Sequence, residues 1–289
     1  MKQIPKGIQY MFVSTLCFAL VGLFFKHLTR VPVSFIIFFR SISAFLVSWA
    51  LLSYQKVPRW GNNWRMLSLR GLSNGVGIAL FFITLVYLPL STANVIQNSS
   101  PIFTAILGIF ILQEPVSLRR WLLFLLTLVG VALTAMQYFS TTGQATYPVI
   151  LGLLSALLLG VSNNLNAKLK SSEHPLVLFN YANVCIGVLT GICCLYTFVC
   201  PTPQEWLFLL ALAIVGYIGE YTAIRAYQLA PVAQVSAISY LGIPCALLID
   251  LSLGEKFQWV TFLGIGLVIL GVLLSLFWEK KEKGTQLNQ

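Results

Sequence analysis

Long apolar runs, each close to the length of a membrane-spanning helix, follow one another along almost the whole chain. A helix that crosses the hydrocarbon core needs roughly 20 predominantly apolar residues. Short polar or proline-containing breaks separate ten such runs: 8–28, 33–53, 67–89, 94–113, 119–137, 148–168, 176–199, 206–228, 233–253 and 258–277. The pattern therefore predicts an all-α integral membrane protein with ten transmembrane helices.

The segment from Tyr87 to Glu114 has an echo from Tyr227 to Glu255. Each copy contains a tyrosine, a turn with a proline, an apolar helix seeded with polar residues, and a glutamate. Identical residues recur 140 or 141 positions apart: Tyr87/Tyr227, Ala93/Ala233, Val95/Val235, Ser99/Ser239, Glu114/Glu255, Gly130/Gly271, Val131/Val272 and Leu133/Leu274. A period of half the chain indicates a duplication. We expect two repeats, 1–140 and 141–289, with five spans each.

An odd number of spans per repeat has a topological consequence. The second repeat must enter the membrane upside down relative to the first. Inverted repeats that bracket a site near the membrane midplane are a common plan of transporters, because two equivalent halves can rock around one site. This is the main sequence argument for transport.

Composition supports the membrane assignment. The chain is 58% hydrophobic and 9% charged, whereas a soluble domain carries about 25% charged residues. Its net charge is +10, but the basic residues lie between apolar runs and do not form a stripe with aromatics, so we expect no nucleic-acid partner.

The basic residues also predict the orientation, since Lys and Arg concentrate on the cytoplasmic side. If both termini are cytoplasmic, the outer side holds Lys26, Arg30 and Lys256, and Arg40 lies within the second span. The cytoplasmic side then holds Lys2, Lys6, Lys56, Arg59, Arg65, Arg70, Arg119, Arg120, Lys168, Lys170, Arg225, Lys280, Lys281 and Lys283. We expect a multi-pass protein of the inner (cell) membrane with a short basic cytoplasmic tail.

Metal, cofactor and enzyme signatures are missing from the sequence. The six cysteines show no C-x-x-C pair and there are two histidines, so we expect neither a metal site nor a cofactor. No HExxH or dinucleotide fingerprint occurs, so a membrane-embedded enzyme is a remote alternative.

The chain resembles the drug/metabolite transporter superfamily of the EamA type over essentially its whole length. The residues that carry the resemblance are Phe39-Arg40, Arg70-Gly71, Pro101 thirteen residues before Glu114, and Leu253-Gly254-Glu255 followed by Gly264 and Gly271. The second half departs from this pattern, because Gly242 replaces the proline and Pro244 is out of register. The resemblance implies two EamA-like repeats and a secondary carrier of small metabolites, often an exporter, with spans 1, 3, 4, 6, 8 and 9 around a central cavity.

Glu220 is the most distinctive candidate residue. A carboxylate in the middle of span 8 costs a few kcal/mol in hydrocarbon, so it should face a cavity or a partner. It is expected to bind an amine or to take up the coupling proton. The alternative is a structural pair with Arg225, although residues five apart do not share a face well. Tyr217, Tyr221 and Tyr227 surround Glu220, and Tyr217 and Tyr221 are substrate-binding candidates. Tyr217 and Tyr227 lie near the Glu220 face and are expected to stack on a ligand or cation, with plain aromatic packing as the alternative.

Amides crowd the fourth span. Asn94, Gln97 and Asn98 share one face with Pro101, which removes a backbone hydrogen bond and is the predicted hinge. The alternative for these amides is hydrogen bonding between helices. Further substrate-binding candidates, on spans 3, 6 and 9, are Asn74, Asn163, Asn164, Gln234, Ser239 and Tyr240.

Two transport hypotheses follow. The first is a proton-coupled or facilitative carrier of an amino acid or other amine-bearing metabolite, with Glu220 at its centre. The second is a carrier of a phosphorylated or nucleotide-derived metabolite that uses Arg40 and Arg225, although Arg40 is also expected to pair with Asp250 or to reach the membrane surface. Gly187 and Gly191 permit a homodimer contact without requiring one.

Overall fold

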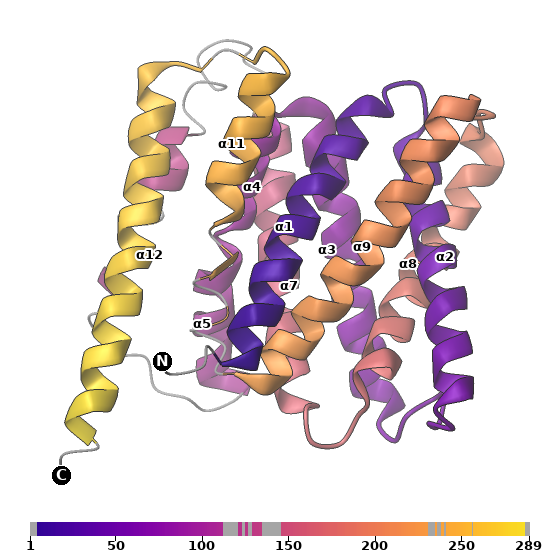
Figure 1. Cartoon of the computed structure of the whole chain (residues 1–289), viewed down its shortest axis with the longest axis horizontal. Coiled ribbons are helices and arrows are strands. Elements are labelled where there is room, and N and C mark those ends of the chain that lie inside the picture. The colour runs from indigo at the N-terminus through magenta and orange to yellow at the C-terminus, as the bar shows by residue number, and fades with distance from the viewer. Residues whose placement is uncertain are drawn as a thin grey trace.

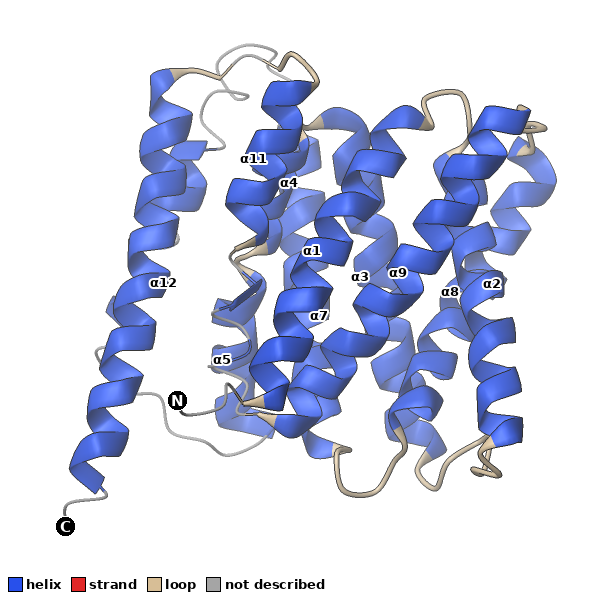
Figure 2. Cartoon of the chain, viewed as in Figure 1, coloured by secondary structure: helices blue, strands red, loops and turns tan. Residues whose placement is uncertain are grey.

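The regular elements of the structure, a computed structural model, are all helices (Figure 2). The structure describes residues 5–111, 121–122, 125–126, 129–134, 146–230, 235, 238–239, 241–255 and 257–286. The helices with their bounds are α1 Lys6–His27, α2 Val33–Tyr54, α3 Trp64–Tyr87, α4 Leu90–Gln97, α5 Ser100–Ile111, α7 Thr146–Lys168, α8 Pro175–Thr197, α9 Pro203–Leu229, α11 Gly242–Ser252 and α12 Trp259–Gln286. The prediction of an all-helical membrane protein agrees with this architecture.

Seven helical segments in these ranges are long and apolar enough to cross a membrane, counting α4 and α5 as one segment from Leu90 to Ile111. Shorter apolar helices cover Gly242–Ser252 and Trp259–Gly271. Parts of the expected spans 119–137 and 233–253 lie outside the described residues. The total of ten spans therefore stays a prediction.

The helix ends follow local sequence signals. Pro5, Pro32 and Pro89 precede α1, α2 and α4, where their missing N–H groups break no intrahelical hydrogen bond. The Asn63 side chain accepts from the Met66 N–H at the start of α3. Thr202 and Glu205 form a capping box at the start of α9. These signals explain why the expected and observed ends differ by only a few residues.

Contacts at the helix ends give the relative directions of the helices. Lys26, near the end of α1, donates a hydrogen bond to the Leu88 carbonyl at 3.0 Å, so α1 and α3 end on the same side of the bundle. Arg70 near the start of α3 contacts Asn166 near the end of α7, so α7 runs antiparallel to α3. It follows that α7 runs in the opposite direction to α1 (Figure 1).

Helices from the two halves of the chain interlock. α1 packs along α9, α3 along α7, and α2 along α8 (Figure 1). α11 lies against α4, and α5 lies against α7. The core of the described protein is therefore built between the halves rather than within each half.

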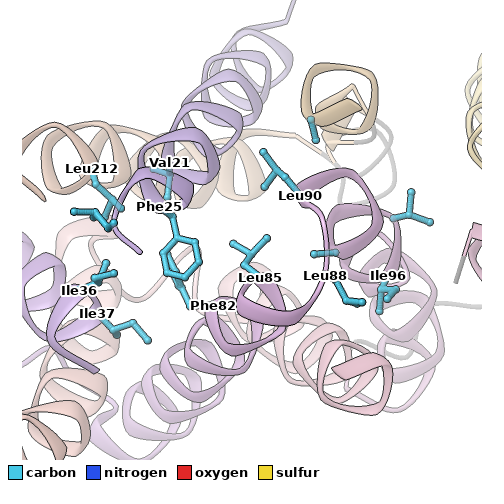
Figure 3. Packing of buried hydrophobic residues seen from close by; sticks show 14 of the residues in the cluster. Val21, Phe25, Ile36, Ile37, Phe82, Leu85, Leu88, Leu90, Ile96 and Leu212 are labelled. Atoms are coloured by element: carbon cyan, nitrogen blue, oxygen red, sulfur yellow. The ribbon is translucent and has the colours of Figure 1, made fainter. Parts of the chain in front are cut away.

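An apolar cluster fills the end of the bundle where α1 and α3 end. Phe25 and Phe82 meet edge to face, with ring centroids 5.0 Å apart. Leu85, Leu88 and Leu90 surround them (Figure 3). We call this group the apolar plug. Its tight packing closes that end of the bundle to polar solutes.

Close helix contacts depend on glycine at a few positions. A Cβ added to Gly71 would lie 2.7 Å from the carbonyl carbon and oxygen of Tyr181 on α8. In contrast, Gly187 and Gly191 face α2 of the same chain, since a Cβ there would meet Ser41 at 3.6 Å and the Phe38 ring at 3.0 Å. The homodimer stays a prediction that the fold does not address.

We predict that Gly71→Ala destabilises the protein although alanine favours helix over glycine. The added methyl group would collide with the α8 backbone, and overpacking typically costs about 1–3 kcal/mol. The matched control is Gly266→Ala on α12, where no atom lies within 4 Å of the added Cβ and stability should be equal or higher. Thermal unfolding of the purified variants in one detergent measures both changes. Equal midpoints for the two variants would contradict the close α3–α8 contact.

Candidate functional site

A cavity of about 190 Å³ lies between helices from both halves of the chain. Aromatic and aliphatic side chains form part of its wall, including Phe18, Phe81 and Phe82. Polar and charged side chains form the rest: Thr15, Arg40, Arg70, Asn74, Asn94, Gln97, Asn98, Ser100, Asn163, Asn166, Glu220, Tyr227 and Ser239. An apolar pocket with a few convergent polar groups is the usual form of a small-molecule site.

The cavity lies in the half of the bundle where α1 begins. Its lining residues on α1 run from Met11 to Val21, and none comes from the last six residues of that helix. On α9, which runs the other way, the lining residues run from Glu220 to Tyr227 near its end. The apolar plug borders the cavity on the side where α1 and α3 end, and its member Phe82 also lines the cavity. The cavity is thus closed on the plug side.

Glu220 lies in the cavity wall with 4% of its surface exposed. Arg40 on α2 donates from Nη2 to Glu220 Oε2 at 2.8 Å and forms an ion pair with it. Asn74 on α3 donates from Nδ2 to Glu220 Oε1 at 3.1 Å. Both carboxylate oxygens therefore have a donor, and the partner is Arg40 rather than the alternative, Arg225.

Arg40 is 3% exposed, and Glu220 compensates the buried charge of its guanidinium group. The expectation that Arg40 pairs with Asp250 was wrong, as was the idea that it reaches the membrane surface. The physical reason is a gap in α9: a Cβ at Gly216 would lie 2.7 Å from Arg40 Nε. Glycine at that position allows the arginine side chain to pass α9 and reach Glu220 one turn further on.

Asp250 has a different role at the closed end of the bundle. It is fully buried on α11, and its two carboxylate oxygens accept hydrogen bonds from the backbone N–H groups of Leu90 at 3.0 Å and Ser91 at 2.6 Å. A carboxylate at a helix N-terminus satisfies free N–H groups and interacts well with the helix dipole. Asp250 therefore fastens α11 to the start of α4.

Arg70 is a cavity residue that the sequence analysis did not select. It was counted as a cytoplasmic surface charge, yet its side chain is 1% exposed. Arg70 donates from Nε to Asn166 Oδ1 at 2.9 Å and from Nη1 to the Leu178 carbonyl at 2.6 Å. The signal in the sequence was the position of Arg70 inside the apolar run 67–89, one helical turn before Asn74.

Several predicted amides and hydroxyls meet in the cavity wall. Gln97 accepts from Ser155 at 2.9 Å through Oε1, while its buried Nε2 has no partner among the described residues. Asn98 donates to the Asn94 carbonyl at 2.7 Å, and Ser239 donates to Asn98 Oδ1 at 3.4 Å. Asn163 also lines the cavity. These side chains place both donors and acceptors on the α4 side of the cavity.

Other predicted site residues lie elsewhere. Tyr217 and Tyr221 stack on each other, with centroids 6.3 Å apart, beside the apolar cluster around Phe179 and not among the lining residues. Asn164 donates to the Thr104 carbonyl at 2.9 Å and joins α7 to α5. Tyr227, which was expected near the Glu220 face, lines the cavity. Gln234 and Tyr240 lie outside the described residues.

The expected span 94–113 is interrupted. α4 ends at Gln97 and α5 begins at Ser100, with Pro101 in the first turn of α5. Pro101 has no N–H to donate to the carbonyl four residues earlier, which belongs to Gln97. The break therefore falls where the proline chemistry predicts it, between cavity residues. Whether Pro101 acts as a hinge stays a prediction.

Comparison with known proteins identifies what the chain is similar to. The model of the EamA-like transporter family matches residues 5–136 and again residues 146–277. A solved crystal structure superposes with a TM-score of 0.73 at 16% identity, covering 95% of this chain and 98% of the other, which supports the fold alone.

Curated relatives carry transporter names. The pseudopaline exporter CntI of Pseudomonas aeruginosa is 25% identical over 243 residues, which are 83% of this chain and 84% of the relative. The S-adenosylmethionine uptake transporter of Rickettsia bellii is 23% identical over 214 residues, which are 74% of this chain and 72% of the relative. An uncharacterized transporter of Helicobacter pylori is 24% identical over 285 residues, with coverage of 93% and 94%.

We predict strong coupling between Arg40 and Glu220 in protein stability. Arg40→Gln or Glu220→Gln alone leaves one buried charge without its counter-charge, which costs about 3–5 kcal/mol. The double variant replaces the ion pair by two neutral amides, so it should be more stable than either single variant. Thermal unfolding of the four proteins in one detergent measures this cycle. Additive losses in the double variant would show that the two charges do not interact.

Proposed function

Because this chain belongs to the EamA-like transporter family, we propose that it carries an amino acid or another small amine-bearing metabolite across the membrane by alternating access around the cavity that holds Glu220. The family and the named relatives are metabolite transporters rather than enzymes. S-adenosylmethionine, named for one group of relatives, is a derivative of the amino acid methionine and fits this substrate class.

The observation that carries the proposal is the buried carboxylate of Glu220 in a cavity with amides on several sides. Charged groups within the membrane are expensive to place and mark substrate or ion pathways. Glu220 already has Arg40 and Asn74 as partners, so an amine or a proton has to compete with Arg40 for the carboxylate. This competition is a direct way to link the occupancy of the site to a rearrangement of α2, α3 and α9.

Helix packing supports the proposed architecture of ten spans in two inverted five-helix repeats, 1–140 and 141–289. If α1, α2 and α3 are equivalent to α7, α8 and α9, a twofold axis converts the α1–α9 pair into the α3–α7 pair and the α3–α8 pair into the α2–α9 pair. All four pairs are in contact, as is the self-related pair α2–α8. The opposite directions of α1 and α7 agree with an inverted relation.

Alternating access requires a gate on each side of the cavity. We place one gate at the closed end, where the apolar plug packs and Asp250 fastens α11 to α4. The distribution of basic residues supports termini on the cytoplasmic side of the inner membrane. The described conformation is then closed toward the outside.

Transport into proteoliposomes tests the proposal. We expect purified protein to take up amino acids or their derivatives from a panel, and Glu220→Gln to lower the uptake rate by roughly 10- to 100-fold, because a hydrogen bond to a charged group is lost. Rates with and without a pH gradient show whether Glu220 serves the proton or the substrate.

Two further variants separate function from folding. The double variant Arg40→Gln/Glu220→Gln restores charge balance and should fold, yet still transport poorly. Glu255→Gln, at an exposed position in the loop after α11, should transport like the unmodified protein. Normal uptake by a folded double variant would remove Glu220 from the mechanism.

We also expect Asp250→Ala to loosen the closed end. The change leaves the buried N–H groups of Leu90 and Ser91 without acceptors, which costs about 1–3 kcal/mol and favours the open arrangement. A cysteine at Leu88, buried in the apolar plug, reports on opening in a background without the native cysteines. A membrane-impermeant maleimide should label it faster in the Asp250→Ala variant, and unchanged labelling would argue against a gate there. Ser252→Ala, at an exposed position of α11, is the control.

A further inference from the structure

The charged groups of the cavity wall do not balance. Two guanidinium groups, Arg40 and Arg70, face one carboxylate, Glu220. We infer that Arg70 binds a carboxylate group of the substrate, so that the protein selects zwitterionic or acidic metabolites over simple amines. This inference rests on the proposed transport function and names the part of the substrate that the proposal leaves open.

Arg70 forms no ion pair among the described residues. Its hydrogen-bond partners are the neutral Asn166 amide oxygen and the neutral Leu178 carbonyl. The ion pair found in the described part of the chain joins Arg40 to Glu220, which leaves Arg70 outside it. A buried cation without an anion is costly, and its positive potential attracts an anionic ligand.

The remaining buried acids are committed elsewhere. Asp250 accepts from the N–H groups at the start of α4. Glu173, in the loop between α7 and α8, accepts from the backbone N–H groups of Asn62 and Asn63 at 2.7 and 2.8 Å. Neither residue lines the cavity. The positive excess of the wall is therefore available to a ligand.

The buried polar atoms of the cavity wall that have no hydrogen-bond partner also favour an anionic ligand. Among the described lining residues, the buried side-chain atoms without a partner belong to Arg40 and to the Gln97 Nε2 group, and all of them are donors. A ligand rich in acceptor oxygens satisfies such groups, whereas an ammonium group brings only donors. The wall thus favours a carboxylate, which accepts hydrogen bonds with both oxygens.

Arg70 and the Asn74 amide, which holds the Glu220 carboxylate of α9, lie on one face of α3. Arg70 and Asn74 are four residues apart and share that face, about 6 Å apart along the helix axis. Asn74 holds Glu220 by a hydrogen bond. The residue that carries the guanidinium group and the residue that holds the Glu220 carboxylate are therefore about one helical turn apart on α3. An α-amino acid presents a carboxylate and an ammonium group in complementary proximity.

A purely structural role for Arg70 makes a different prediction. Arg70 connects α3 to α7 and α8, so its loss could weaken folding without any effect on ligand choice. Selectivity between two ligands that differ only in a carboxylate is a readout that a structural role would not move. Arg70→Lys keeps the charge but loses the planar fork, and Arg70→Gln removes the charge.

The test measures uptake into proteoliposomes and ligand-induced thermal stabilisation for matched probes. The pairs are L-methionine with 3-(methylthio)propylamine and L-phenylalanine with 2-phenylethylamine. In each pair the amine differs from the amino acid only in lacking the carboxylate. L-serine, ethanolamine and O-phosphoethanolamine compare a carboxylate, no anion and a phosphate. Protein-free liposomes correct for passive entry of the amines. Arg65→Gln removes an exposed arginine from the same helix and is the control.

We expect amino acids to be preferred over their decarboxylated amines. Arg70→Gln should weaken the apparent affinity for the amino acid by roughly 10- to 100-fold, Arg70→Lys less, and Arg65→Gln not at all. If Arg70→Gln does not fold, the selectivity of the unmodified protein and of Arg70→Lys decides.

Equal handling of amino acid and amine, with no change in Arg70→Lys, would overturn the inference while transport itself stands. Preference for O-phosphoethanolamine over serine would assign the site to phosphate and overturn the carboxylate assignment. If no probe is transported or bound, the proposed amine-bearing substrate class fails, and the inference fails with it.

Discussion

The ion pair between Arg40 and Glu220 is the interaction on which the rest of the site depends. Each charge alone would be very costly at this depth, and together they join α2 to α9 across the middle of the bundle. Gly216 provides the space for the arginine, and Asn74 holds the second carboxylate oxygen. Three helices thereby meet at one carboxylate, and any ligand that competes for Glu220 acts on all three.

Much of the fold could be predicted because its physical causes are local. Apolar length, prolines at helix starts and the Thr202–Glu205 capping box define α1, α2, α3, α7, α8 and α9 closely. The interruption between α4 and α5 also follows from one residue, Pro101. The sequence alone indicated Glu220, since a lone carboxylate in an apolar run is visible without coordinates.

The partners of Glu220 were harder to predict because they come from distant helices. Arg40 was expected to pair with Asp250, and nothing local distinguishes one acid from the other. The deciding features, the gap at Gly216 and the free N–H groups at the start of α4, appear once the helices are packed. Arg70 was misread for a similar reason: counting basic residues near helix ends does not separate a surface charge from one that turns inward.

The two buried carboxylates Glu220 and Asp250 have different roles in the bundle. Asp250 neutralises a helix terminus and so needs no cation, which lets the closed end remain apolar around Phe25 and Phe82. Glu220 needs Arg40, which leaves Arg70 as the unbalanced charge of the cavity. The net positive wall of the cavity can accept an anionic group, but the apolar plug beside it gives that group no polar path. In the proposed transport cycle we therefore expect the plug to separate, beginning at the contact between α11 and α4.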